Sequence, residues 1–131
     1  MMIACLYNVT YNELQALITF PSLDLAVETS NTKFIPIFRN IPQFSEEINK
    51  PFAIRSDRLK LSNALIYWLG AGGSRISSRS AQLVIGDEVA IWQAPNGVNQ
   101  IEELKKRTRS YNECLQLFVS TPQYKQDYFW R

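Results

Sequence analysis

The chain has 131 residues, a length typical of one domain with a single hydrophobic core. Hydrophobic residues make up 46% and charged residues 20%, which are near globular averages and exclude a disordered chain. The net charge of +2 is too small to indicate a nucleic-acid or membrane partner by itself. No stretch approaches the roughly 20 apolar residues of a membrane helix. We therefore expect one α+β domain, residues 1–131, in the cytoplasm.

Short apolar runs predict the first elements of the chain. Residues 2–7 are apolar and predict a buried strand. Thr10 and Glu13 form a capping-box pattern, in which each side chain can bond the backbone amide of the other residue. This pattern predicts that a short helix follows it.

Residues 23–38 predict a β-hairpin. Residues 23–29 alternate apolar and polar side chains, and residues 33–38 follow a polar turn. Pro36 lacks an amide proton, so the second strand should lie at a sheet edge or carry a bulge. The stretch from Leu25-Ala26-Val27-Glu28 through Phe34-Ile35-Pro36-Ile37-Phe38 resembles part of the SseB-type N-terminal domain. The resemblance covers a small part of the chain and implies no function.

The second half of the chain predicts two longer helices and a second hairpin. Ser56 is a good cap for a helix over residues 57–70, and Gly86-Asp87 predicts a two-residue turn between two strands. A stripe of apolar residues three and four apart predicts a helix over residues 99–118. The predicted fold is α+β: a mainly antiparallel sheet of five to six strands, built from two hairpins, with two or three helices packed on one face.

Several groups that usually carry catalysis are absent from the sequence. The chain has no histidine, and its two cysteines, Cys5 and Cys114, are far apart. These features exclude histidine-based nucleophile activation and a cysteine-rich zinc site. The glycine-rich stretch 70–75 lacks the Gly-Lys-Ser/Thr ending of a Walker loop. We therefore expect no enzyme, no catalytic residues, no cofactor and no metal.

Carboxylates offer the remaining route to catalysis. Asp24 and Glu28 with Lys33, or Asp87 with Glu88, are candidate sets for a metal-dependent centre. Neither set has the Glu-x-Lys strand spacing of metal-dependent nucleases. We interpret the first acids as solvent-facing strand residues and the Asp-Glu pair as turn residues. An enzyme would require these carboxylates to converge in the fold.

The middle of the chain is its most basic part. Residues 53–80 carry five basic side chains against Asp57 alone, and the segment is also rich in serine. Such a set could hold phosphate groups. The predicted helix 57–70 would be about 20 Å long, so its two ends need not form one patch. The candidate anion or nucleic-acid ligands are Arg55, Arg58, Lys60, Arg75 and Arg79.

The end of the chain is aromatic and is the candidate protein interface. Residues 123–131 either fold back over the core or pair with another subunit, because aromatic residues with arginine are typical of interface hot spots. The candidates are Tyr124, Tyr128, Phe129, Trp130 and Arg131. We predict a small non-enzymatic protein-interaction module (a subunit, adaptor, inhibitor or immunity-type binder) with a protein partner or self-association and no membrane. The alternative is a nucleic-acid or phosphate-binding accessory protein that uses residues 53–80.

Overall fold

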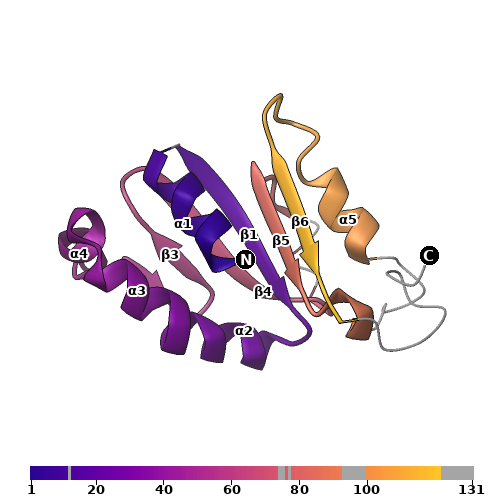
Figure 1. Cartoon of the computed structure of the whole chain (residues 1–131), viewed down its shortest axis with the longest axis horizontal. Coiled ribbons are helices and arrows are strands. Elements are labelled where there is room, and N and C mark those ends of the chain that lie inside the picture. The colour runs from indigo at the N-terminus through magenta and orange to yellow at the C-terminus, as the bar shows by residue number, and fades with distance from the viewer. Residues whose placement is uncertain (12, 74–75, 77, 93–99, 122–131) are drawn as a thin grey trace.

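The fold is built on one mixed sheet of six strands in the order β2-β3-β4-β1-β5-β6 (Figure 1). The computed structural model describes residues 1–11, 13–73, 76, 78–92 and 100–121. Strands β1, β4, β5 and β6 are parallel, whereas β2 and β3 form an antiparallel hairpin that joins β4. The strands are β1 (Leu14–Phe20), β2 (Ile54–Arg55), β3 (Arg58–Lys60), β4 (Ala64–Gly70), β5 (Leu83–Asp87) and β6 (Leu115–Val119). The predicted mixture of helices and strands is confirmed, but the predicted antiparallel arrangement is wrong.

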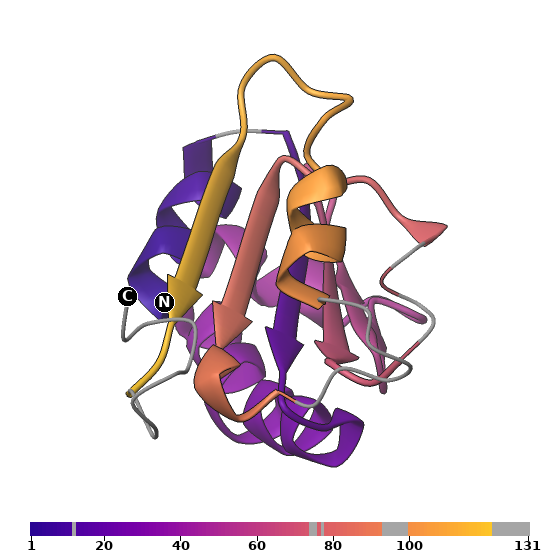
Figure 2. The ribbon, with the colours of Figure 1, turned by 90° about the vertical axis from the view of Figure 1, so that its right-hand side faces the viewer.

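Helices cover both faces of this sheet. The segments α1 to α4 lie on one face and α5 lies on the other (Figure 2), so the prediction of helices on one face only is wrong. None of the helices in the described residues is long and apolar enough to cross a membrane. The helical segments are α1 (Met2–Tyr11), α2 (Leu23–Thr29), the π-helix η1 (Ser30–Phe34), α3 (Ile35–Asn40), α4 (Pro42–Ile48), the 3-10 helix η3 (Val89–Ile91) and α5 (Gln100–Lys106).

The first two elements are the reverse of those predicted. Residues 2–7 belong to helix α1, and the residues after the capping-box pattern form strand β1. The buried residues Cys5 and Val9 of α1 are four positions apart and so share one helix face, which packs on the sheet. Strand β1 lies between β4 and β5 and is buried on both faces, so it is apolar without alternation.

The predicted hairpin over residues 23–38 is a continuous helical run. Ser22 caps α2 by accepting a hydrogen bond from the Leu25 amide, and α2 continues through η1 into α3. Pro36 lies at the start of α3 and cannot donate to the carbonyl four residues before it. The wider turn of η1, closed by the bond from the Ile35 amide to the Ser30 carbonyl, accommodates this proline. The resemblance to an SseB-type hairpin therefore fails.

The second half of the chain also departs from its prediction. Residues 57–70 form β3 and β4 in place of a helix, and β5 runs through Gly86-Asp87 in place of a hairpin turn. The predicted helix 99–118 is divided into α5 and β6. Both β4 and β5 are apolar runs buried on both faces, and such runs resemble buried helix segments in sequence.

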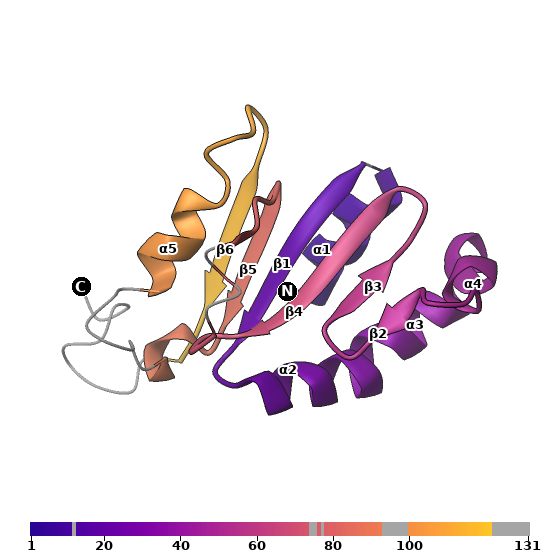
Figure 3. The ribbon, with the colours of Figure 1, turned by 180° about the vertical axis from the view of Figure 1, so that it is seen from behind.

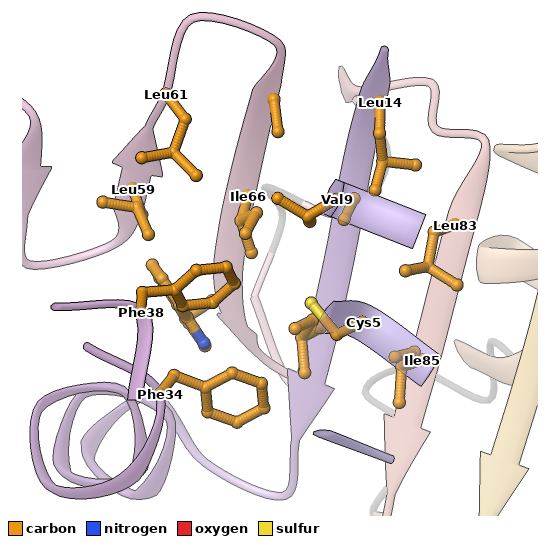
Figure 4. Packing of buried hydrophobic residues seen from close by; sticks show 14 of the residues in the cluster. Cys5, Val9, Leu14, Phe34, Phe38, Leu59, Leu61, Ile66, Leu83 and Ile85 are labelled. Carbon is orange, nitrogen blue, oxygen red and sulfur yellow. The ribbon is translucent and has the colours of Figure 1, made fainter. Parts of the chain in front are cut away.

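The larger core lies between the sheet and the helices α1 to α4 (Figure 4). Trp68 of β4 is fully buried and meets Phe34 edge to face, with ring centroids 6.0 Å apart. Gly70, at the end of β4, permits a close approach to the start of α2, because an added Cβ would lie 2.5 Å from the Leu23 backbone nitrogen. This packing fixes the carboxyl end of β4 against the helical run.

Candidate functional site

The carboxyl ends of the parallel strands gather at one edge of the sheet, which we call the carboxyl edge. The chain goes from β1 to β4 on one side and then returns to β5 on the other side of β1 (Figure 3). In open α/β sheets, ligands bind outside the carboxyl ends of the strands where the order reverses in this way. At this edge β5 ends in Asp87, which is followed by Glu88, and β6 is followed by Ser120.

Asp87 is the carboxylate that β5 delivers to this edge. It follows four buried residues of the strand and is itself only half-buried. Burial raises the pKa of this carboxyl above its usual range, and the neighbouring charge of Glu88 raises it further. A hydrogen bond from the Glu88 amide and the charge of Lys33 act in the opposite direction with smaller effect. The site is therefore a partly desolvated acid at the end of a rigid strand.

Glu88 has an unusual backbone conformation. Its φ of 52° and ψ of 41° lie in the left-handed region, which costs a residue with a β-carbon about 1–2 kcal/mol. The Glu88 carbonyl accepts a hydrogen bond from the Ile91 amide at 3.1 Å, and the Asp87 carbonyl accepts one from the Trp92 indole at 2.9 Å. The turn after β5 is thus held in a strained shape, which is common at functional sites.

The packing beneath this turn has no spare room. A Cβ added to Gly86 would lie 2.7–2.8 Å from side-chain atoms of Phe118, Trp92 and Val89. These side chains cover the backbone immediately before the acidic pair. A larger residue at position 86 would displace them and the turn with them.

Ser120 connects the ends of β5 and β6. Its hydroxyl oxygen accepts a hydrogen bond from the Ala90 amide at 3.0 Å, across 30 residues of sequence. Because Ala90 lies in η3, the bond ties the residue after β6 to the turn that carries Glu88. A displacement of the residues at the end of β6 would therefore also displace the turn that carries the acidic pair.

The other candidate acids do not join this pair as a metal cluster. Asp24 and Glu28 are exposed on α2. No group of three or more aspartate, glutamate, histidine or cysteine side chains suited to a metal ion occurs within the described part of the chain. Cys5 is buried, which raises the pKa of its thiol to about 12 and makes it inert.

Part of the predicted basic group is brought together by the sheet. Arg55 and Arg58 are register partners in the β2-β3 hairpin, and Lys60 follows on β3. Arg58 also pairs in register with Tyr67 of β4, and the guanidinium of Arg79 lies 4.1 Å from the centre of the Tyr67 ring. The predicted helix that would have separated these residues does not form.

Two sets of predicted residues lie outside the described residues. Arg75 is one of them, and the aromatic segment from Tyr124 to Arg131 is the other. Their proposed roles in anion binding and in a protein interface stay predictions.

Comparison with known proteins identifies the family. A family model described as "Phage terminase large subunit gpA, ATPase domain" matches residues 1–130. The chain belongs to this family. No curated protein matches the chain.

Two solved large terminases share the fold of this family member. One is the large terminase of a thermophilic bacteriophage, with 14% identity and a TM-score of 0.62 over 97% of this chain and 31% of that chain. The other is the large terminase ATPase domain of Thermus phage P74-26, with 17% identity and a TM-score of 0.56 over 92% of this chain and 52% of that one. The chain thus spans about half or less of either structure's length.

Membership in a terminase ATPase family overturns the prediction of a non-enzymatic interaction module, and with it the alternative of an accessory binding protein. The absence of histidine was a poor guide, because phosphoryl transfer relies on positioning and electrostatics and does not require an imidazole. A nucleic-acid or protein partner remains compatible with a terminase domain.

The sequence analysis considered Asp87 and Glu88 as a candidate pair for a metal-dependent centre, but assigned them to a hairpin turn. A usable signal was present in the sequence Leu83-Val84-Ile85-Gly86-Asp87-Glu88. An apolar run that ends in two acids is typical of a buried parallel strand that delivers a carboxylate to the carboxyl edge, as in the Walker B position of P-loop NTPases. The Gly-Asp dipeptide also fits a turn, and that interpretation was wrong.

Proposed function

We propose that this terminase-family chain carries the acidic part of an ATP-hydrolysing centre, with Asp87 and Glu88 as its working residues. The observation that carries the proposal is the position of this pair at the carboxyl end of the buried strand β5. The match to an ATPase-domain family supports it, as does the strained backbone of Glu88. The substrate is ATP with its Mg²⁺ ion.

Asp87 is suited to hold the Mg²⁺ that accompanies ATP. Magnesium is usually bound by one or two carboxylates together with phosphate oxygens and water, so a single aspartate is sufficient. In P-loop NTPases a Walker B aspartate has this role. Partial burial strengthens the attraction between the carboxylate and the ion because less water screens it.

Glu88 is suited to orient the attacking water and to accept its proton. The water oxygen attacks the γ-phosphorus, the bond to the bridging oxygen breaks, ADP leaves with the bonding electrons, and the water proton passes to the carboxylate. A base adjacent in sequence to the metal ligand lies at the same edge of the sheet. The left-handed turn at Glu88 is fixed by the bonds of η3 and Ser120, which limits its freedom.

A phosphate-binding loop is the part of such a centre that these 131 residues do not contain. The outer edge of β6 offers a place for it to enter, because within the described residues only β5 pairs with β6. Strand β6 is apolar like an interior strand, yet Leu115 and Val119 are 42% and 40% exposed. A strand added parallel to β6 along this edge would place its own carboxyl end beside Ser120 and the acidic pair.

The test is ATP hydrolysis by the assembly that contains this chain, with Glu88→Gln and Asp87→Asn variants. We expect Glu88→Gln to bind ATP and to lower the hydrolysis rate by about 10²- to 10⁴-fold, because only the proton acceptor is lost. Asp87→Asn should also lower the Mg²⁺ dependence of ATP binding, because the metal ligand is lost.

Glu28→Gln is the matched control, because it makes the same change on the exposed surface of α2 and should leave hydrolysis unchanged. Hydrolysis at the unaltered rate by both Glu88→Gln and Asp87→Asn would show that the proposal is wrong. Equal losses in Glu88→Gln and Glu28→Gln would point to a general effect of charge and would contradict the role of the pair.

A further inference from the structure

An exposed aromatic residue lies at the opposite edge of the sheet from β6. Phe52, just before β2, is 77% exposed, and its φ of 66° is in the left-handed region. Both features disfavour phenylalanine at this position, because a bulky residue is rarely left-handed and a large apolar side chain is rarely so exposed. Strain of this kind is found at ligand-binding positions.

Basic residues surround this aromatic ring. Phe52 lines an open pocket of about 410 Å³ together with Lys50 and Lys60. The guanidinium carbon of Arg55 lies 5.9 Å from the centre of the Phe52 ring, within the range of a cation-π contact. Residues 50–60 contain four basic side chains and one acidic side chain. The surface therefore combines an exposed aromatic ring, with the Arg55 guanidinium over it, and a basic rim.

The one acid that lines the pocket is already engaged. Glu47 accepts hydrogen bonds from the amide and the hydroxyl of Ser62, the latter at 2.8 Å. These bonds lower the pKa of Glu47. The carboxylate is thus directed to the β3-β4 turn and helps to fix one wall of the pocket.

We propose that this pocket binds single-stranded nucleic acid, with one base stacked on Phe52 and the adjacent phosphates held by Lys50, Arg55 and Lys60. Proteins that bind single strands combine a basic groove with aromatic residues on which bases stack. The positive rim is complementary to phosphates, whereas a hydrophobic protein partner would favour fewer charges around the ring. A duplex keeps its bases stacked internally, so the exposed ring favours a single strand.

This site is separate from the ATP site. Four strand spacings of about 4.8 Å lie between β2 and β5, a separation of roughly 19 Å. The pocket is also lined by Leu61 and Ser62 of the β3-β4 turn, which precedes β4 and so lies toward the amino ends of the parallel strands. The base of an ATP molecule at Asp87 is therefore not the occupant of the Phe52 pocket.

The experiment measures the affinity of the chain for a fluorescent thymidine oligomer of about 20 nucleotides, which exceeds the usual site size. We expect Phe52→Leu to weaken binding roughly 5- to 150-fold, the loss of one stacked base. Arg55→Gln and Lys60→Gln should each reduce the slope of log affinity against log salt by about 0.7, as expected when one phosphate contact to a single strand is lost. Phe52→Leu should leave that slope unchanged.

Tyr11→Leu is the matched control, because Tyr11 is 71% exposed on α1 and is not among the residues that line the Phe52 pocket. It should bind the oligomer like the unaltered chain, and so should Asp87→Asn, which separates this proposal from the ATPase proposal. Equal affinity for Phe52→Leu and the unaltered chain would overturn the proposal. A duplex that binds as tightly as the oligomer would also overturn it. Competition by polyglutamate that is as strong as competition by the oligomer itself would identify an acidic protein as the partner and would overturn it too. The same holds for equally strong competition by thymidine monophosphate.

Discussion

Two residues other than glycine have a left-handed backbone within the described part of the chain, one next to the interior strand β5 and the other next to the edge strand β2. Glu88 follows the buried strand β5. Its turn is fixed by two hydrogen bonds, one from the Trp92 indole to the Asp87 carbonyl and one from the Ala90 amide to the Ser120 hydroxyl. Phe52 precedes the edge strand β2, and backbone bonds fix its turn, from the Ala53 amide to the Lys50 carbonyl and from the Lys60 amide to the Ala53 carbonyl.

The contrast shows two ways in which a fold can support an unfavourable residue. At Glu88 the surrounding core determines the conformation, so the strained residue is rigid and suited to hold a reacting group in one place. At Phe52 the backbone is held but the ring projects into water, so the unfavourable exposure is relieved only when a ligand covers it. The first arrangement suits catalysis, and the second suits binding.

The largest expected effect comes from Asp87→Asn, which should lower ATP hydrolysis at least about 100-fold and yet stabilise the fold at neutral pH. Because the pKa of Asp87 is raised in the folded state, its ionised form weakens folding. This weakening is absent below the unfolded pKa of about 3.9 and is complete above the folded pKa. The stability advantage of Asp87→Asn should therefore grow as the pH rises above about 4 and become constant above the folded pKa.

The measurement is chemical denaturation of both proteins across this pH range, together with the hydrolysis assay. Glu28→Gln serves as the control for a lost surface charge. A stability difference that is constant with pH would contradict the assignment of Asp87 as a partly desolvated acid.

Gly86→Ala tests the rigid support beneath the acidic pair. The added Cβ would overlap Phe118, Trp92 and Val89, and overpacking of this kind costs about 1–3 kcal/mol of unfolding free energy. Gly72→Ala is the matched control, since no atom lies within 4 Å of a Cβ at that position. If the two variants unfold at the same denaturant concentration, the turn after β5 is not held by this packing.

Ser120→Ala tests the hydrogen bond that ties the turn after β5 to the end of β6. The change leaves the partly buried Ala90 amide without its acceptor, which we expect to cost about 1 kcal/mol of unfolding free energy and to lower the hydrolysis rate. Ser80→Ala, at an exposed serine, is the comparison. A full hydrolysis rate despite the lost stability would separate Ser120 from the function of Glu88.

The comparison also explains which parts of the fold the sequence could predict. Its short apolar runs correctly indicated a chain of mixed helices and strands with one sheet of five to six strands. The order and direction of the strands could not be predicted, because a strand buried on both faces has no alternation. Residues 64–70 were taken for a helix, although they pair along their full length with β1. Pro36 was taken for a strand-edge residue, although a π-helical turn accommodates it within a helix.

The candidate sites were harder to predict because the sheet is what brings the residues of each site together. The Asp-Glu pair is informative only when β5 is known to be a parallel strand, and the basic residues come together only when β2, β3 and β4 pair. Arg55, Arg58 and Lys60 were singled out by charge alone, and the fold places them on one hairpin. Phe52 was not singled out at all, because its exposure and its φ are properties of the folded chain.

The smallest expected effect concerns the free protein at Phe52. Asparagine tolerates the left-handed region better than phenylalanine, so Phe52→Asn should raise the free energy of unfolding by about 1 kcal/mol while it removes the stacking surface. Phe52→Leu keeps a β-carbon and an apolar side chain, so it should lose binding without this gain. Thermal unfolding of the two variants beside the unaltered chain makes the comparison. A loss of stability in Phe52→Asn would show that the Phe52 ring packs on its own fold, as Trp92 does near Glu88. That result would remove the contrast between Phe52 and Glu88.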